Sequence, residues 1–225
     1  MKLKIKIKTN RKMLTIVLVI SLVFVLLAFL IASIGAPAQQ QRITIAAWQP
    51  STKPGDITPQ RTSEYAAGNQ EAALTRSNEA VIMGGAGGTK KDGPQYSYYS
   101  RGWNADNQWW QLSEISTNGY ENIEISFMTK GSDTGPKNFA LEYSTDGTEW
   151  QPLTNSSNAP ITYTIAADNK FHQHGPYALP TEINDIGRLY VRFINTDAKS
   201  IVGGPTKSAG TNYISDITIT GTSMG

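Results

Sequence analysis

The segment IEISFM, residues 123–128, alternates Ile123, Ile125 and Phe127 with Glu124, Ser126 and Met128. Alternation with a period of two places one face of a β-strand on a core and the other towards solvent. The same pattern recurs at residues 139–144, 189–194 and 216–220. Weaker strand candidates are residues 43–48, 80–83, 108–112, 148–153 and 161–165. These segments predict an all-β domain.

Turn-forming residues separate these segments. Asp146-Gly147 lies between two strand candidates and is the strongest hairpin signal in the chain. Residues 63–76 are rich in Ala but lack a clear apolar stripe, which indicates a loop or one short helix. About eight to ten short strands in one unit are typical of a two-sheet antiparallel β-sandwich or jelly roll.

The N-terminus differs in character from the rest. Six cations and no acid lie within residues 2–12, and the uncharged, largely apolar residues 14–34 follow, from Leu14 to Ile34. About 20 apolar residues suffice to cross a bilayer as a helix, with flanking cations on the cytoplasmic side. We therefore expect an extracytoplasmic domain, N-terminus in and C-terminus out. Ala36-Pro37-Ala38 resembles a signal-peptide cleavage site, so release by cleavage and retention as a membrane anchor are alternatives.

This organisation predicts a leader at residues 1–38, a spacer at 39–45 and a β-domain at 46–225. The chain carries 20 Lys and Arg against 18 Asp and Glu, and six of these cations lie in the leader. The exported part is therefore mildly acidic, which argues against nucleic acid as a partner. The chain has no Cys, so the domain is held together without disulfides.

Several segments in order resemble the galactose-binding-like β-sandwich modules of bacterial secreted and surface proteins, which are related in fold to discoidin domains and carbohydrate-binding modules. They are residues 46–48, 102–103, 109–111, 115–123, 134–139, 142–150, 189–193 and 214–221. The resemblance spans nearly all of the exported part. It implies a jelly-roll sandwich of the kind that usually serves as a recognition or scaffolding module and not as a catalyst. Such modules usually accompany another domain, and none is evident here.

Aromatic residues crowd into residues 96–110, and sugars bind by stacking on aromatic rings with a few polar contacts. Trp109 and Trp110 are adjacent, so in a strand only one of them can enter the core. One interpretation is that these rings only pack the domain. The alternative is an exposed binding platform for carbohydrate, formed by Tyr98, Tyr99, Trp103, Asn104, Asp106 and Trp109.

The sequence contains two candidate metal sites. His172 and His174 project to the same side of an extended segment, as transition-metal ligands do, but no third ligand of matching spacing is evident. The resemblance implies a structural Ca²⁺ near the terminal strands, with Asp216 as a ligand and Asp56 or Glu79 completing the shell. The alternative for Asp216 is a solvent-facing position on an edge strand.

Catalytic motifs are missing from the sequence: it contains neither G-x-S-x-G nor H-E-x-x-H, and it lacks a Cys nucleophile. We therefore expect a non-catalytic module that binds glycan on a cell surface or in secreted form. The alternatives are an adhesive surface protein that contacts other proteins, and an accessory domain for a separate secreted hydrolase. A cryptic hydrolase would require converging carboxylates or a histidine-bound metal.

Overall fold

The computed structural model describes residues 41–50, 61–62, 69, 71–77, 82–85, 93–94, 96–155 and 157–225. The predicted membrane segment, residues 14–34, lies outside these ranges. Within them, no helix is long and apolar enough to cross a membrane. Residues 41–225 form one compact unit whose described buried hydrophobic residues all lie at position 45 or later. A fragment of residues 39–225 therefore retains the whole described core.

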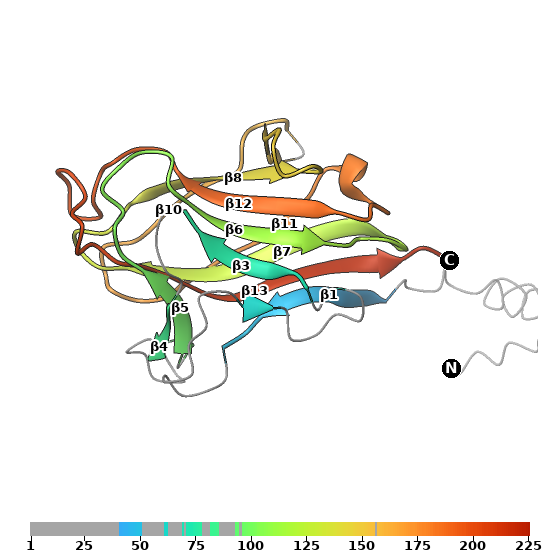
Figure 1. Ribbon diagram of the computed structural model, residues 1–225, viewed down its shortest axis with the longest axis horizontal. Coiled ribbons are helices and arrows are strands. Elements are labelled where there is room, and N and C mark those ends of the chain that lie inside the picture. Colours follow the sequence, from blue (N-terminus) through green and yellow to red (C-terminus); the bar gives the residue numbers. More distant parts are fainter. Residues whose placement is uncertain are drawn as a thin grey trace, which may run out of the picture. The chain divides into compact units, whose positions relative to one another are not determined.

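The strands form two antiparallel sheets stacked as layers (Figure 1). Sheet 1 has the order β11 (His172–Ala178), β7 (Tyr120–Gly131), β13 (Asn212–Ser223), β5 (Tyr96–Ser100) and β4 (Ile82–Gly85), with β1 (Arg42–Trp48) also paired to β13. Sheet 2 has the order β10 (Thr162–Thr164), β8 (Asn138–Ser144), β12 (Leu189–Asn195), β6 (Trp109–Ile115), β3 (Ala73–Arg76) and β2 (Arg61–Thr62), with β9 (Gln151–Pro152) on β8. A 3-10 helix, η1 (Thr181–Ile183), precedes β12. The predicted two-sheet antiparallel sandwich is confirmed.

The core lies between the sheets and is built by the predicted alternation. In β7, Ile123, Ile125 and Phe127 are buried, while the residues between them are only partly buried. In β12, Phe193 points into the same layer, and its ring centroid lies 4.7 Å from that of Phe127 in an edge-to-face arrangement. Edge-to-face aromatic pairs add to the stabilisation that burial itself provides. The two sheets are thus joined by interlocking side chains.

Some elements differ from the sequence prediction. Residues 73–76, which were predicted to lie in a loop or short helix, form strand β3. Pairing with β6 brings Leu74 opposite Leu112, where its side chain is buried. Strand β1 begins at Arg42, inside the predicted spacer, because pairing with β13 starts there. After Asp146-Gly147 the chain does not continue directly as a strand, and only the short β9 pairs with β8. Strands β5 and β11 were not predicted.

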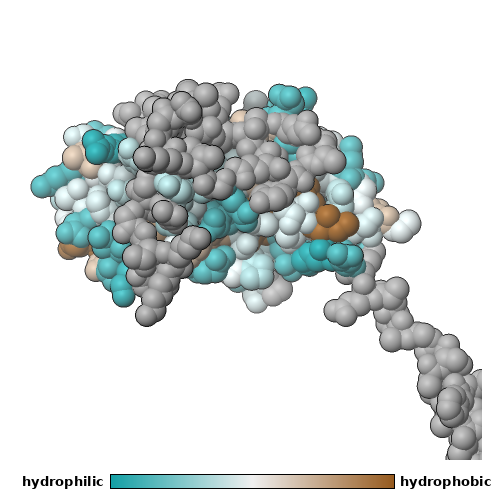
Figure 2. All heavy atoms as spheres, turned by 90° about the horizontal axis from the view of Figure 1, so that it is seen from below, coloured by the Kyte–Doolittle hydropathy of each residue, from teal (hydrophilic) through white to brown (hydrophobic). Residues whose placement is uncertain are grey.

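The exposed surface carries few large hydrophobic side chains. Among the described residues these are Ile43, Val202 and Met224. Figure 2 shows mostly hydrophilic and intermediate colours between the grey residues, with brown confined to small spots. Isolated apolar residues of this kind are normal on a soluble domain and do not indicate a binding surface.

We predict that Phe193→Ala lowers the free energy of unfolding by about 3–5 kcal/mol, because it opens a cavity between the sheets. Urea unfolding of residues 39–225, followed by tryptophan fluorescence, measures the change. Val202→Ala is the matched control, since Val202 is 62% exposed and its truncation should change stability by less than about 0.5 kcal/mol. Equal effects of the two substitutions would contradict this placement of the core.

Candidate functional site

Two of the predicted platform residues lie in the core. Trp103 is 0% exposed, and its indole Nε1 donates a hydrogen bond of 3.1 Å to the carbonyl oxygen of Ser100. The guanidinium carbon of Arg76 lies 3.6 Å from the centroid of the Trp103 ring. Tyr98 is 2% exposed. In this structure neither ring presents a face on which a ligand could stack.

The other predicted platform residues are dispersed. Tyr99 is partly exposed on sheet 1, where its ring lies 5.6 Å from that of Tyr213. Asn104 and Asp106 are exposed in the loop that leads into β6. Trp109 projects from the outer side of sheet 2. The six residues therefore do not form one continuous surface.

Asn195 fixes the loop that carries Asn104 and Asp106. Its side-chain oxygen accepts a hydrogen bond of 2.6 Å from the backbone nitrogen of Gln108, and its Nδ2 donates to the carbonyl oxygen of Ala105 at 2.9 Å. Since Asn195 is fully buried at the end of β12, the loop is anchored to the sheet by these bonds.

The outer side of sheet 2 gathers a different set of residues, which we call the tryptophan face: Trp109, Gln111, Glu142, Trp150 and Arg192. The strand register brings them together, since Arg192 of β12 lies opposite Gln111 of β6 and opposite Glu142 of β8. Arg192 Nε donates a hydrogen bond of 2.8 Å to Gln111 Oε1. Of this set, only Trp109 belongs to the platform predicted from the sequence.

Arg192 contacts both tryptophans of this face. Its guanidinium carbon lies 3.6 Å from the Trp150 ring centroid and 4.5 Å from the Trp109 ring centroid. A guanidinium stacks well on an indole because the cation is attracted to the negative ring face. Both indoles remain partly exposed. The contact therefore holds two rings on the open side of a sheet without hiding them.

The two charges of this face lie beside each other. Burial lowers the pKa of Arg192, and the negative charge of Glu142 acts in the opposite direction. Burial likewise raises the pKa of Glu142, against the effect of the positive charge of Arg192. The cation and the carboxylate thus offset each other within the protein.

A tight turn positions Trp150 on the tryptophan face. Asp146 Oδ1 accepts hydrogen bonds from the backbone nitrogens of Thr148 at 2.7 Å and Glu149 at 2.9 Å, and from Ser144 Oγ at 2.9 Å. These bonds, led by that from Glu149, hold the pKa of the Asp146 carboxyl well below its usual range. The turn predicted at Asp146-Gly147 therefore positions Trp150, a function that its sequence alone did not indicate.

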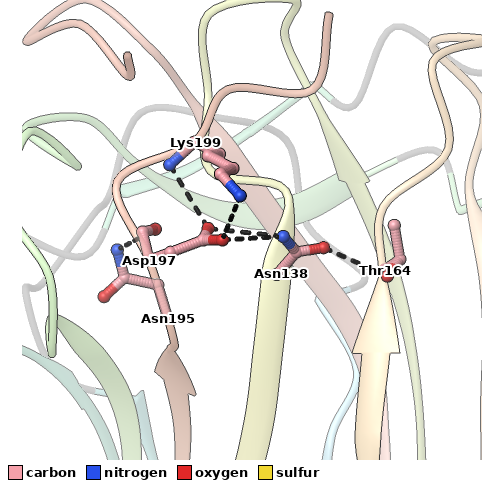
Figure 3. A network of polar contacts seen from close by, with 5 residues as sticks. All are labelled: Asn138, Thr164, Asn195, Asp197 and Lys199. Atoms are coloured by element: carbon pink, nitrogen blue, oxygen red, sulfur yellow. Dashed lines mark hydrogen bonds and ion pairs between the residues drawn. The ribbon is translucent and has the colours of Figure 1, made fainter. Parts of the chain in front are cut away.

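A polar network lies at the start of β8 and the end of β12 (Figure 3). Asn138 Nδ2 donates to both carboxylate oxygens of Asp197, at 3.1 and 3.3 Å, while its Oδ1 accepts from Thr164 Oγ1 at 3.2 Å. Lys199 Nζ lies 3.9 Å from Asp197. The network joins β10, β8 and the segment after β12, and it pairs the cation of Lys199 with the carboxylate of Asp197.

The two histidines have different partners. His172 Nε2 is hydrogen-bonded to Asp168, at 2.9 and 3.0 Å from its two carboxylate oxygens. His174 Nε2 is hydrogen-bonded to Thr129 Oγ1 at 2.7 Å, and its ring stacks on Phe127 at 5.1 Å. Among the described residues, no group of three or more His, Cys, Asp or Glu is placed to hold a metal.

Asp216 lies next to an irregularity in the pairing of β13 with β7 and has a positive φ of 48°. Burial raises the pKa of its carboxyl, and Ser215 Oγ donates to it at 3.4 Å. Asp56 and Glu79, the other predicted calcium ligands, lie outside the described residues. The calcium site therefore stays a prediction.

Two hollows adjoin near η1. One, of about 360 Å³, is lined in part by Arg42 and Glu124, which form an ion pair of 3.0 Å. The other, of about 310 Å³, is lined in part by Glu182, whose carboxylate accepts a hydrogen bond from Tyr143 at 2.8 Å. Each of these carboxylates is thus bound to a protein partner.

Comparison with known proteins finds likeness only in structure. No protein-family model matches the chain, and no curated protein matches it. The second CBM22 xylan-binding domain of Xyn10C from Paenibacillus barcinonensis is 16% identical, with 66% of this chain and 91% of that chain covered and a TM-score of 0.42. The K2 cleaved adhesin domain of Lys-gingipain is 14% identical, with 71% and 97% covered and a TM-score of 0.40.

A further solved structure, TmCBM61 in complex with β-1,4-galactotriose, is 13% identical, with 65% of this chain and 85% of that chain covered and a TM-score of 0.35. Carbohydrate-binding modules are thus among the structures found, in line with the resemblance drawn from the sequence.

We predict that acid destabilises the domain partly through His174. Burial, and secondarily the charge of His172, lowers the pKa of His174 from 6.5 to about 4. Between these values the unfolded chain binds a proton that the folded chain does not, so stability falls as the pH falls through this window. Urea unfolding between pH 7 and pH 4 should show a shallower decline for His174→Leu than for the wild type. Parallel declines would show that His174 does not contribute.

Proposed function

We propose that the domain is a non-catalytic recognition module that binds polysaccharide on the tryptophan face. The observation that carries the proposal is the placement of two partly exposed indoles, Trp109 and Trp150, on either side of Arg192. The C–H faces of sugar rings pack on such aromatic surfaces, and side-chain amides and carboxylates supply hydrogen bonds to the hydroxyls. Gln111 and Glu142, which lie opposite Arg192 in the strand register, are the groups of this face that would supply such hydrogen bonds.

The arrangement of carboxylates supports binding without catalysis. Hydrolysis of a glycosidic bond ordinarily requires two carboxyl groups that flank the bond. Glu142 is the only acid among the five residues that define the tryptophan face, and Arg192 lies opposite it in the strand register. Another acid of sheet 2, the exposed Glu114, lies five residues from Trp109 along β6. An open sheet face on which one carboxylate lies beside a cation suits the binding of a sugar chain better than its cleavage.

We further propose that the module acts outside the cytoplasmic membrane. The basic start of the chain and the apolar residues 14–34 support export. The mature N-terminus, determined by mass spectrometry, distinguishes the two fates: Gln39 indicates a released protein, and an intact leader indicates a tethered one. A native protein that remains in the cytoplasm would contradict export.

We predict that Trp109→Ala and Trp150→Ala each weaken polysaccharide binding about tenfold, since each removes one stacking surface. Affinity electrophoresis of residues 39–225 in gels containing xylan, β-glucan or galactan measures the loss. Tyr99→Ala is the matched control, because Tyr99 is also a partly exposed aromatic residue but lies on sheet 1. The proposal fails if none of these polymers retards the domain, or if Tyr99→Ala alone reduces retardation.

A further inference from the structure

We infer that the tryptophan face selects uncharged polysaccharides and discriminates against acidic ones. This inference rests on the proposed function and specifies the class of ligand. It follows from how the charges of sheet 2 are distributed and paired. Aromatic stacking alone does not distinguish a neutral chain from an acidic one, because both present C–H faces.

The cation at the centre of the face is already engaged. The guanidinium of Arg192 has an indole ring close to it on two sides, donates through Nε to Gln111 and lies beside Glu142. An anionic sugar would have to compete with these partners for the same charge. The geometry therefore makes Arg192 a positioning residue that holds the two rings.

The charges around the face do not favour an anion either. Asp146 and Glu149 are exposed in the turn that carries Trp150. Arg188, directly before β12, is an exposed cation. At the opposite end of β12, Lys199 is paired with Asp197. Polyanion binding depends on clustered cations without such partners, whereas like charges near a ligand repel it.

A matched set of polymers tests the inference. The parent polymer is whichever of xylan, β-glucan and galactan residues 39–225 bind best. It is compared with its carboxymethylated derivative and with its hydroxyethylated derivative of equal substitution, which controls for bulk. We expect the carboxymethylated form to bind about fivefold more weakly than the hydroxyethylated form at low ionic strength, with a smaller difference at high ionic strength.

The possible outcomes distinguish failure of this inference from failure of the proposed function. Binding of the carboxymethylated polymer as tight as, or tighter than, that of the hydroxyethylated polymer overturns the inference and leaves the proposed function standing. Binding of no polysaccharide overturns both.

Reversal of the charge of Glu149 tests whether the acidic turn causes the discrimination against acidic polysaccharides. Glu149 is exposed and forms the turn through its backbone nitrogen, so Glu149→Lys keeps that bond. We expect Glu149→Lys to bind the neutral polymer like the wild type and to reduce the discrimination at least about twofold. An unchanged ratio of the two affinities would show that the charges at this turn do not set the selection.

Discussion

No disulfide joins the two sheets, because the chain has no cysteine, so their contact depends on side-chain packing and hydrogen bonds. Aromatic rings take part in the contact between the layers, together with many aliphatic side chains. Phe127 of sheet 1 meets two rings of sheet 2, Phe193 at 4.7 Å and Tyr163 at 5.1 Å. Since an extended strand turns successive side chains to opposite faces, each ring that enters the core directs its neighbour outward. The packing of the core thereby decides what the outer surface presents.

This constraint links the core to the candidate site. Trp110 points inward, where its indole Nε1 donates a hydrogen bond of 2.6 Å to Asn212 Oδ1 of sheet 1. Trp109 must then point outward, over the open side of sheet 2. Arg192 is directed outward in the same way by Phe193, its buried neighbour. Trp150, by contrast, lies in a turn, so its position depends on the hydrogen bonds that Asp146 accepts.

Much of the fold was predictable from sequence because regular alternation marks strands such as β7 and β12. Strand β11 was missed, since Gly175 and Pro176 interrupt its pattern, and β5 was missed because its tyrosines and serines resemble a polar loop. The sequence around Trp103 did not indicate that its side chain is buried. Its core position depends on contacts with Arg76 and Ser100, which form only on folding. The pairing of Trp150 with Arg192 joins residues distant in sequence, so no local spacing could indicate it.

The central claim is that Trp109 and Trp150 together contact the ligand. Nuclear magnetic resonance tests it directly, because each indole N–H of residues 39–225 gives its own signal. On titration with a short oligosaccharide of the preferred polymer, the account predicts that the Trp109 and Trp150 signals shift, while those of Trp103 and Trp110 stay in place. Shifts confined to the signals of these two core tryptophans, or oligosaccharide binding that moves neither Trp109 nor Trp150, would contradict it.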